Sequence, residues 1–380
     1  MSSSSSSSAQ RIVCGDEAYA ICSVPNGLNE SLFAVACGSS SSSNVKIFYV
    51  DAQTHRLKEK TELMRSVPSS SGKIADVDCC GKGPGHDLES DDGANISIMA
   101  ACTREGDVSV FQKEGKNVSK KGKGQYSSCK FDPNDGRVLA MVTIGGDSVC
   151  FYDHENDKEV GSFITGGSGK KNSKGDWSKA NRNEFAFTKD GNVFVVDSRV
   201  NSSNSKPMVS QTSSFRDVAF SANEEGRYII TASEDWLVKT WDMRKNDGTP
   251  VKCFAGHKGS VTKARFNPVY ESICLSSSVD GTAKLWRDSD LGRLPDDDDS
   301  GRRSKKANVD ENSNNNNNSE GISLELTTYG NLHTTPIGSF SPVVDACWSS
   351  NDPWVFSAIT MDGTVALDVV PRSEKYRILL

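Results

Sequence analysis

Histidine is scarce in this chain of 380 residues, which has only five, and long apolar runs are missing. No stretch approaches the ~20 apolar residues that span a bilayer, and no basic-then-apolar leader opens the chain. Neither end carries a lipidation motif, so any membrane association is expected to be indirect. We therefore expect a cytoplasmic protein that is neither secreted nor embedded in a membrane.

The eleven cysteines include no CxxC pair, which favours free thiols in a reducing compartment over metal ligands. Lys and Arg total 44 against 50 Asp and Glu, and the resulting net charge of −6 argues against a nucleic-acid surface. None of the histidines has a carboxylate or nucleophile at a recognised motif spacing. We expect no catalytic residue, no metal, no cofactor and no small-molecule substrate, and a role in binding other proteins.

What the chain does contain is a repeat, which is clearest at residues 256–288. Gly256-His257 precedes two strand-like segments that are joined by a turn at Asp280, and the second ends at Trp286. This spacing resembles one blade of a WD-repeat β-propeller. A buried imidazole needs partners for both ring nitrogens, so we expect His257 to bond to Asp280 and, through a Ser or Thr hydroxyl, to link on towards Trp286. We interpret this network as scaffold and not as an acid/base pair.

Further copies of the pattern are found along the chain. Asp235 and Trp241 repeat the turn and the strand end 45 residues before the first motif, and Asp362 marks another turn near the C-terminus. Blades that recur every ~45 residues cannot bury their own faces and must stack on neighbours. The pattern predicts an all-β chain with a single seven-bladed WD-repeat β-propeller over residues 11–370. The predicted blades lie near residues 18–51, 74–111, 125–153, 176–200, 215–244, 257–288 and 343–369, with residues 11–15 as the closing strand of the last blade.

Low-complexity segments flank or interrupt the repeats. Residues 289–320 include Asp296–Asp299 and Asn314–Asn318, and they offer almost nothing apolar that could offset the cost of chain ordering. We expect them to form a disordered insertion before the last blade. Residues 1–10 are expected to form a disordered serine-rich tail.

Residues 371–380 follow the last blade as a C-terminal tail. The tail ends in an apolar group that has to be covered, made up of Tyr376, Ile378, Leu379 and Leu380, and Lys375 beside it is a further candidate for binding a partner. We favour packing of this group on the propeller as a clasp. Its use as a docking peptide for a partner is the alternative.

Three residues beside the blade turns are candidates for binding a partner. Trp236 follows the turn aspartate of its blade, where small residues usually sit, and Arg216 and Lys258 lie on loops of the same face. An exposed tryptophan beside an arginine is typical of an interaction hot spot. Packing of Trp236 over the adjacent blade is equally compatible with the sequence.

The end of the chain and several blade motifs resemble one family. The motifs are Val370-Pro371-Arg372, Lys375-Tyr376, Ile378-Leu379-Leu380, Phe215-Arg216-Asp217 and Trp241-Asp242-Met243-Arg244. Over residues 176–380 the chain resembles the EARP and GARP complex-interacting protein family. The resemblance implies a non-catalytic adaptor that binds EARP and GARP tethering-complex subunits at endosomes and the trans-Golgi network. Such an adaptor would support endosomal recycling and retrograde vesicle traffic.

Two blade ends support an alternative function. Asp197-Ser198-Arg199 and Trp241-Asp242-Met243-Arg244 place Arg199 and Arg244 at the ends of successive blades. This arrangement resembles the tandem Asp-x-Arg motif of substrate receptors for cullin-type ubiquitin ligases. Pairing of each arginine with its own blade-end carboxylate is the structural alternative, which we prefer.

Overall fold

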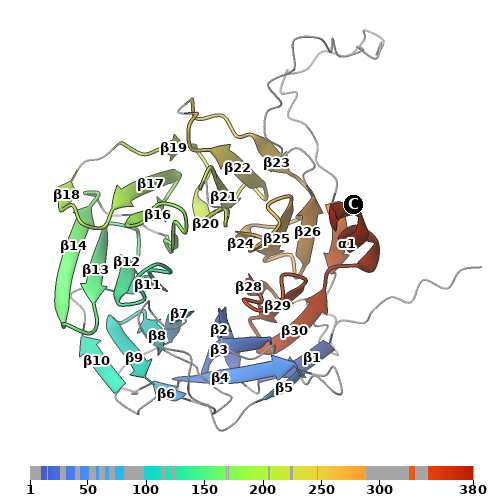
Figure 1. Cartoon of the computed structure of the whole chain (residues 1–380), viewed down its shortest axis with the longest axis horizontal. Helices are drawn as coiled ribbons and strands as arrows, with labels where there is room; N and C mark the ends of the chain where they lie inside the picture. The colour runs from blue at the N-terminus through green and yellow to red at the C-terminus, as the bar shows by residue number, and fades with distance from the viewer. Residues whose placement is uncertain are drawn as a thin grey trace, which may run out of the picture.

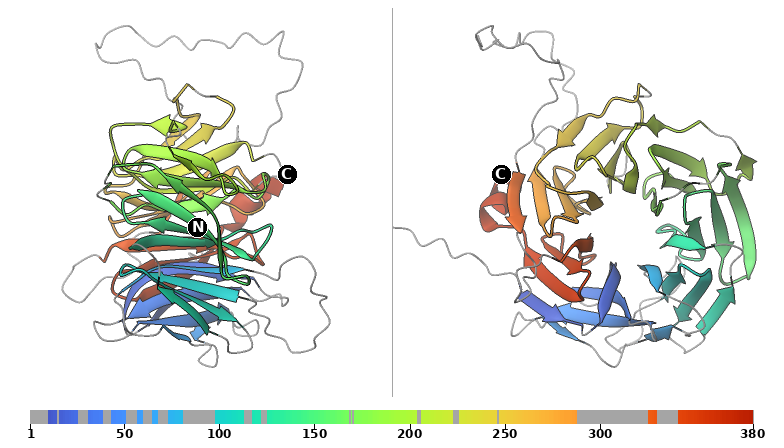
Figure 2. Two further views of the ribbon diagram at one scale, coloured as in Figure 1. Left: turned by 90° about the vertical axis from the view of Figure 1, so that its left-hand side faces the viewer. Right: turned by 180° about the vertical axis from the view of Figure 1, so that it is seen from behind.

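Seven β-sheets are arranged radially around a central axis in the computed structural model, and one short helix lies at the rim (Figure 1). The strand that begins each blade lies nearest the axis, and the view from behind shows the same closed ring, which the side view shows edge-on (Figure 2). The helix is α1 (Arg372–Leu379). The structure describes residues 10–14, 16–25, 31–38, 43–50, 57–59, 65–67, 73–80, 98–112, 117–121, 125–167, 169, 171–203, 206–222, 226–245, 247–287, 325–329 and 341–379.

Blades one to three come from the N-terminal half of the chain, and each starts with its innermost strand. Blade one contains β2 (Glu17–Val24), β3 (Leu32–Gly38), β4 (Ser43–Val50), β5 (Leu57–Glu59) and β6 (Arg65–Val67), of which the last two both pair with β4. Blade two contains β7 (Ile74–Cys80), β8 (Ile98–Thr103), β9 (Asp107–Gln112) and β10 (Asn117–Lys121). Blade three contains β11 (Tyr126–Phe131), β12 (Val138–Thr143), β13 (Ser148–Asp153) and β14 (Lys158–Ile164), with β18 (Ser202–Ser203) parallel to β14.

Blades four to six repeat the antiparallel order. Blade four contains β15 (Gly175–Trp177), β16 (Glu184–Lys189), β17 (Asn192–Asp197) and β19 (Val209–Ser210). Blade five contains β20 (Phe215–Phe220), β21 (Tyr228–Ser233), β22 (Val238–Asp242) and β23 (Lys252–Phe254). Blade six contains β24 (Val261–Phe266), β25 (Ile273–Ser278), β26 (Ala283–Arg287) and β27 (Glu325–Tyr329).

Blade seven closes the ring with strands from both ends of the described chain. Its first three strands are β28 (Val343–Trp348), β29 (Val355–Thr360) and β30 (Thr364–Val369), and its outermost strand is β1 (Gln10–Val13). β1 pairs with β30 from Gln10 opposite Leu367 to Val13 opposite Thr364. The predicted all-β, seven-bladed propeller is confirmed.

The predicted closing strand at residues 11–15 overlaps β1, but the predicted ranges of the first six blades do not reach their outermost strands. β5, β10, β14, β19, β23 and β27 all lie beyond them. These strands are short or polar, as the sequences of β10 (NVSKK) and β27 (ELTTY) illustrate, so the apolar alternation that indicates a strand is weak in them.

The third and fourth strands of blade six are far apart in the sequence. β27 pairs with β26, so the stretch of sequence between them separates two strands of one blade and not two blades. The predicted insertion at residues 289–320 falls outside the described residues, as do residues 1–9 of the predicted tail. Gln10, which was assigned to that tail, belongs to β1.

Apolar clusters hold neighbouring blades face to face. Seven buried clusters are present in the described residues, and each is shared by two adjacent blades. Phe254 and Trp286 join blades five and six, with ring centroids 5.6 Å apart. Phe33 and Val365 belong to the cluster that joins blades one and seven. This confirms that each blade buries its faces against its neighbours.

A β-bulge near the start of the inner strand positions the side chains of the central channel. Six inner strands, β2, β7, β11, β20, β24 and β28, show a register shift at the same relative place. A bulge re-aims the residues that follow it. The residues directly after the bulges are Ala20, Asp76, Ser128, Asp217, Lys263 and Asp345.

Candidate functional site

The two faces of the ring carry different sets of candidate residues. We call the face where the inner strands begin the top face, and the face where they end the bottom face. Because the strands of a blade are antiparallel, the turns between second and third strands lie on the top face and the third strands end on the bottom face. The top face therefore carries Arg216, Trp236 and Lys258, and the bottom face carries Arg199, Arg244 and α1.

A chain of hydrogen bonds runs through blade six from the turn to the third strand. His257 Nδ1 lies 3.1 Å from Asp280 Oδ2, and His257 Nε2 lies 2.7 Å from Ser276 Oγ. Trp286 Nε1 donates to the same hydroxyl at 2.8 Å. Burial opposes ionisation of Asp280, but hydrogen bonds from His257 and Thr282 hold the pKa of this carboxyl below its usual range.

These hydrogen bonds engage both ring nitrogens of His257. The imidazole is fully buried and edge-on to the Trp286 ring, with centroids 5.9 Å apart. A general base needs a nitrogen that can reach a substrate proton. The geometry of His257 therefore supports a scaffold role.

Blades five and seven contain only parts of the hydrogen-bond network that blade six has. Trp241 Nε1 donates to Thr231 Oγ1 at 2.9 Å, and Asp235 pairs with Lys239 at 2.8 Å. In blade seven the backbone amide of Thr364 donates to Asp362 Oδ1 at 3.4 Å. The turn aspartates thus hold local turn geometry in blades five to seven, and of these three blades only blade six adds a histidine in the described residues.

Trp236 is exposed and its backbone is strained. The side chain is 52% exposed, and φ is 73°, in the left-handed region that favours glycine. The equivalent turn positions of blades six and seven hold Gly281 and Gly363, with φ of 81° and 85°. A non-glycine residue in this conformation costs about 1 kcal/mol or more, and such outliers often mark functional positions.

Arg216 and Lys258 lie near this turn. Arg216 is the bulge residue of β20, and its guanidinium pairs with Glu234, two residues before Trp236, at 3.4 Å. The Lys258 amide donates to Asp280 Oδ2 at 2.7 Å, which fixes the backbone while the side chain remains exposed. The structure therefore places all three candidates on the top face of blades five and six.

Two further apolar residues on the top face escaped the sequence reasoning. Val279 and Met361 are exposed and each directly precedes the turn aspartate of its blade. Together with Trp236 they put one exposed apolar side chain on each of blades five, six and seven. The position beside a turn aspartate is the signal that could have identified them.

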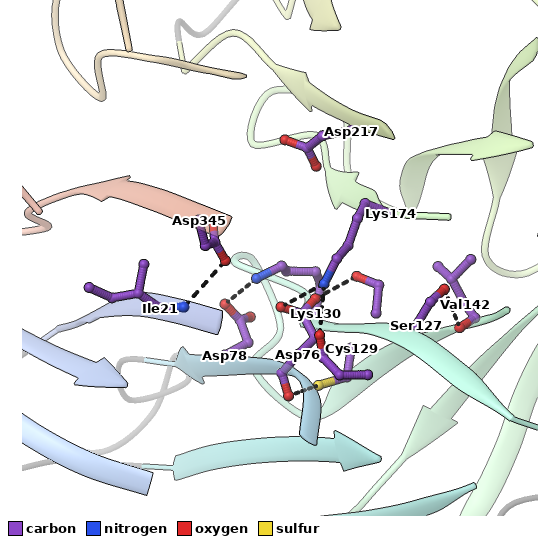
Figure 3. A network of polar contacts seen from close by, with 12 residues as sticks. Ile21, Asp76, Asp78, Ser127, Cys129, Lys130, Val142, Lys174, Asp217 and Asp345 are labelled. Carbon is purple, nitrogen blue, oxygen red and sulfur yellow. Dashed lines mark hydrogen bonds and ion pairs between the residues drawn. The ribbon is translucent and has the colours of Figure 1, made fainter. Parts of the chain in front are cut away.

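Charged side chains line the channel between the inner strands. Lys130 of blade three pairs with Asp78 of blade two at 3.1 Å, and Lys174 pairs with Asp76 at 3.2 Å (Figure 3). Asp76 is buried, which opposes its ionisation, but the charges of Lys130 and Lys174 hold its pKa below the usual range. These ion pairs join the inner strands of different blades.

On the opposite side of the channel, ion pairs also join the inner strands of neighbouring blades. Arg265 of blade six pairs with Asp217 of blade five, and Lys263 pairs with Asp345 of blade seven at 3.2 Å. Burial raises the pKa of a further carboxyl, Asp176, which the charge of Arg265 only partly offsets.

The channel aspartates also bond to the backbone of the next blade. For four of them, a carboxylate accepts a hydrogen bond from an inner-strand amide of the neighbouring blade, as Figure 3 shows for Asp345 and Ile21. The bonds run from Phe131 to Asp78 at 2.9 Å, from Phe220 to Asp176 at 3.2 Å, from Ala264 to Asp217 at 3.3 Å and from Ile21 to Asp345 at 3.2 Å. They link blades three to two, five to four, six to five and one to seven.

The channel opens into a cavity of 430 Å³ at the bottom face. Its lining includes residues that follow the inner strands, such as Pro25, Pro133 and Pro268, together with Cys22 and Cys79. The sequence alone does not identify the channel residues, because their contacts depend on the register of inner strands from different blades.

The two Asp-x-Arg arginines bond to their own blade ends. Arg199 pairs with Asp197 at 2.6 Å and Arg244 pairs with Asp242 at 3.2 Å. The arginine side chains are nevertheless 66% and 62% exposed. Both guanidinium groups are thus held in place on the bottom face and remain accessible.

The C-terminal segment forms α1 and not an extended tail. Pro371 precedes the helix, where a fixed φ and a missing amide are tolerated. One face of the helix rests on the propeller: Ile378 packs against the core shared by blades six and seven, and Glu374 pairs with Arg287 at 3.3 Å. Lys375 Nζ lies 5.3 Å from the centroid of the Trp354 ring.

The prediction that the whole apolar end is covered is wrong. Tyr376 and Leu379 are 65% and 59% exposed, while Leu380 falls outside the described residues. Helical geometry is the reason, since residues four apart such as Glu374 and Ile378 share a face and turn the other side chains outward.

Asp368 of blade seven lies where blade five has Trp241, one residue before the position equivalent to Asp242, and the two aspartates have opposite environments. Asp242 accepts hydrogen bonds from Arg244 and Arg227 at 3.2 Å each; despite its burial, these hold its pKa below the usual range. Asp368 is buried, and within the described residues its Oδ2 has no hydrogen-bond partner. Burial raises the pKa of Asp368 to about 6, which a bond from the Val369 amide only partly offsets.

Neither a membrane-spanning helix nor a metal cluster is found in the part of the chain that the structure describes. α1, with its eight residues, is too short and too polar to cross a bilayer. Within the same residues, no group of three or more His, Cys, Asp or Glu side chains is arranged to hold a metal ion.

Two segments of the chain match a known repeat. Residues 248–287 and 330–367 match the family model described as WD domain, G-beta repeat, and they cover most of blades six and seven. The chain is a WD-repeat β-propeller.

This WD-repeat propeller is similar to several curated proteins. Human EARP and GARP complex-interacting protein 1 is 30% identical over 170 residues, and the match covers 43% of this chain and 40% of the human protein. The EARP-interacting protein homolog of Gekko japonicus is 28% identical over 174 residues, with the same coverage of 43% and 40%. WD repeat-containing protein DWA2 of Arabidopsis thaliana is 23% identical over 238 residues, which are 62% of this chain and 61% of that protein. The chain thus spans less than half the length of the two EARP-related proteins in these matches.

Removal of the shared hydroxyl in blade six is expected to destabilise the WD-repeat propeller. Ser276→Ala leaves a buried histidine nitrogen and the Trp286 indole N–H without their common partner, which costs about 2–4 kcal/mol in the free energy of unfolding. Urea denaturation followed by circular dichroism measures this loss. Ser210→Ala, which removes an exposed hydroxyl on β19, is the control and is expected to cost less than about 0.5 kcal/mol. Equal stability of the two variants would show that the hydrogen-bond network of blade six contributes nothing to the free energy of unfolding.

Asp368→Asn is expected to stabilise the propeller near neutral pH. The folded-state pKa of about 6 lies above the ordinary value of 3.8, so folding favours the protonated carboxyl. Its stabilising contribution to the free energy of unfolding is fully present below pH 3.8 and is lost as the pH rises through 6. Near neutral pH the substitution is expected to raise the free energy of unfolding by up to about 3 kcal/mol, because the pKa rises from 3.8 to about 6 and one pKa unit corresponds to about 1.4 kcal/mol. The gain is expected to vanish towards pH 4, as measured by urea denaturation across this range.

Asp242→Asn is the matched control with the opposite sign. The pKa of Asp242 is lowered, so its stabilising contribution is present at neutral pH and is lost as pH falls. This variant is expected to be less stable than wild type near neutral pH. A gain for Asp368→Asn that does not change with pH would contradict the assignment to ionisation.

Proposed function

We propose that this protein is a non-catalytic adaptor that binds subunits of the EARP and GARP tethering complexes and supports endosomal recycling and retrograde vesicle traffic. The observation that carries the proposal is its similarity to human EARP and GARP complex-interacting protein 1, at 30% identity over 170 residues. The geometry is compatible with it, since both nitrogens of His257 are engaged and the channel charges are paired with one another. In this role the protein is peripheral at endosomes and the trans-Golgi network, and its partners hold it at the membrane.

The top face of blades five to seven is the proposed docking surface. It presents Trp236, Val279 and Met361 as exposed apolar side chains, with Arg216 and Lys258 beside them. Tryptophan and arginine bury much area at small entropic cost when a partner covers them. Strain at Trp236 supports this choice, because a glycine at that turn would fold more readily.

Trp236→Gly separates binding from folding. The substitution removes the proposed anchor and relieves the backbone strain, so we expect at least a tenfold loss of captured tethering-complex subunits, in line with about 2 kcal/mol for a hot spot. The free energy of unfolding is expected to stay equal or to rise by about 1 kcal/mol. The measurement is affinity purification of the tagged full-length protein at physiological salt, with mass spectrometry of the bound proteins.

Tyr376→Ala is the control, since it removes an aromatic side chain of similar exposure from the bottom face. It is expected to leave the capture of tethering subunits unchanged. Loss of capture with Tyr376→Ala but not with Trp236→Gly would move the docking surface to α1. Recovery of no tethering subunit with the wild-type protein would overturn the proposal as a whole.

A second candidate function rests on Arg199 and Arg244, which are exposed on the bottom face of successive blades. As a substrate receptor of a cullin-type ubiquitin ligase, the protein would present these arginines to the ligase adaptor. The same purification distinguishes the two functions. Recovery of a cullin adaptor without tethering subunits, and its loss on Arg244→Ala with unchanged folding, would favour the ligase function.

A further inference from the structure

The junction between blades one and two differs from the four junctions at which an aspartate accepts a hydrogen bond from an inner-strand amide. No aspartate-to-amide bond is found between β2 and β7 in the described residues. Instead, Cys22 of β2 lies beside Cys79 of β7, with their sulfur atoms 3.3 Å apart in a thiol–thiol hydrogen bond. The two inner strands are thus linked by a pair of thiols at the place where other blades use a carboxylate.

This thiol pair faces the bottom of the channel. Cys22 and Cys79 both line the 430 Å³ cavity, which Cys80 and Cys347 line as well. Cys22 is buried, whereas Cys79 is partly exposed. A small reagent that enters the cavity can therefore reach Cys79 first.

We propose that Cys22 and Cys79 form a reversible disulfide bond that joins blade one to blade two when the protein meets a small peroxide oxidant. The inference is independent of the proposed tethering function, because it depends only on the two sulfur atoms and their access. A disulfide requires sulfur atoms about 2.05 Å apart, so the two sulfur atoms, which are 3.3 Å apart, have to approach each other further for the bond to form.

The chemistry balances with hydrogen peroxide as the two-electron oxidant. The Cys79 thiolate attacks one peroxide oxygen, the O–O bond breaks, and the hydroxide released takes up a proton as water, which leaves Cys79 as a sulfenic acid. The Cys22 sulfur then attacks the Cys79 sulfur, the S–S bond forms and the S–O bond breaks. The second hydroxide leaves as water with the Cys22 proton.

The order of these steps follows from the environment of the two thiols. The hydrogen bond with Cys79 and burial both raise the pKa of Cys22 well above its usual range. Because the thiolate is the nucleophile, Cys22 is poorly suited to attack peroxide. It is well placed to resolve the sulfenic acid of Cys79, since its sulfur already contacts that side chain.

The bond would constrain the chain across 57 residues of sequence. Cross-linking reduces the freedom of the unfolded chain, so the oxidised propeller is expected to melt at a higher temperature than the reduced one. It would also fix the blade junction at one side of the cavity mouth.

Peptide mapping of the oxidised full-length protein tests the proposal. The protein is treated with hydrogen peroxide, free thiols are alkylated, and a non-reducing digest is analysed by mass spectrometry. We expect a Cys22–Cys79 cross-linked peptide that accounts for most of both cysteines, a higher melting temperature, and reversal of both by dithiothreitol.

Three variants give the comparison. Cys22→Ser and Cys79→Ser are expected to lose the cross-link and the rise in melting temperature, whereas Cys80→Ser, from the same cavity, keeps both. Should a variant fail to fold, the wild-type peptide map still decides. Cross-links through Cys80 or Cys347, cross-links between molecules, or conversion of Cys79 to sulfinic acid without a bridge would each overturn the proposal.

Discussion

Each inner strand of the propeller has an edge that no sheet partner covers, because the neighbouring blade packs against it with its face. Amides on this edge are buried at the centre of the ring, where an unpaired group costs about 1–3 kcal/mol. At four junctions an aspartate of the adjacent blade satisfies such an amide, as Asp78 does for Phe131 and Asp345 does for Ile21. Lysine and arginine side chains of nearby inner strands compensate the buried carboxylates. The ring therefore depends on polar bonds at its centre as well as on the apolar clusters between blades.

This constraint directs function to the two faces of the ring. Carboxylates and cations that are paired with one another across the channel are poorly suited to hold a substrate. The top face offers a strained and exposed Trp236, and the bottom face offers α1, the two blade-end arginines and the thiol-lined cavity. A protein-binding role follows from this distribution more readily than a catalytic one, and the similarity to EARP-interacting proteins supports it.

The sequence was informative where a contact lies within one blade. His257, Asp280 and Trp286 have a fixed spacing because a local chain of hydrogen bonds joins them, so the repeat and the number of blades could be predicted. The channel pairs could not, since Asp217 and Arg265 are 48 residues apart and meet only when the register of two blades is known. The outer strands of blades one to six and α1 were missed for a different reason, because short polar segments carry little hydrophobic pattern.

Native-state hydrogen exchange of the wild-type protein, resolved at single amides by NMR, tests the central claim that aspartates hold the inner edges. The amides of Ile21, Phe131, Phe220 and Ala264 donate to channel carboxylates. They are predicted to exchange as slowly as ladder amides of the middle strands, because they open only when neighbouring blades separate. Exchange at the rate of exposed loop amides would contradict the account.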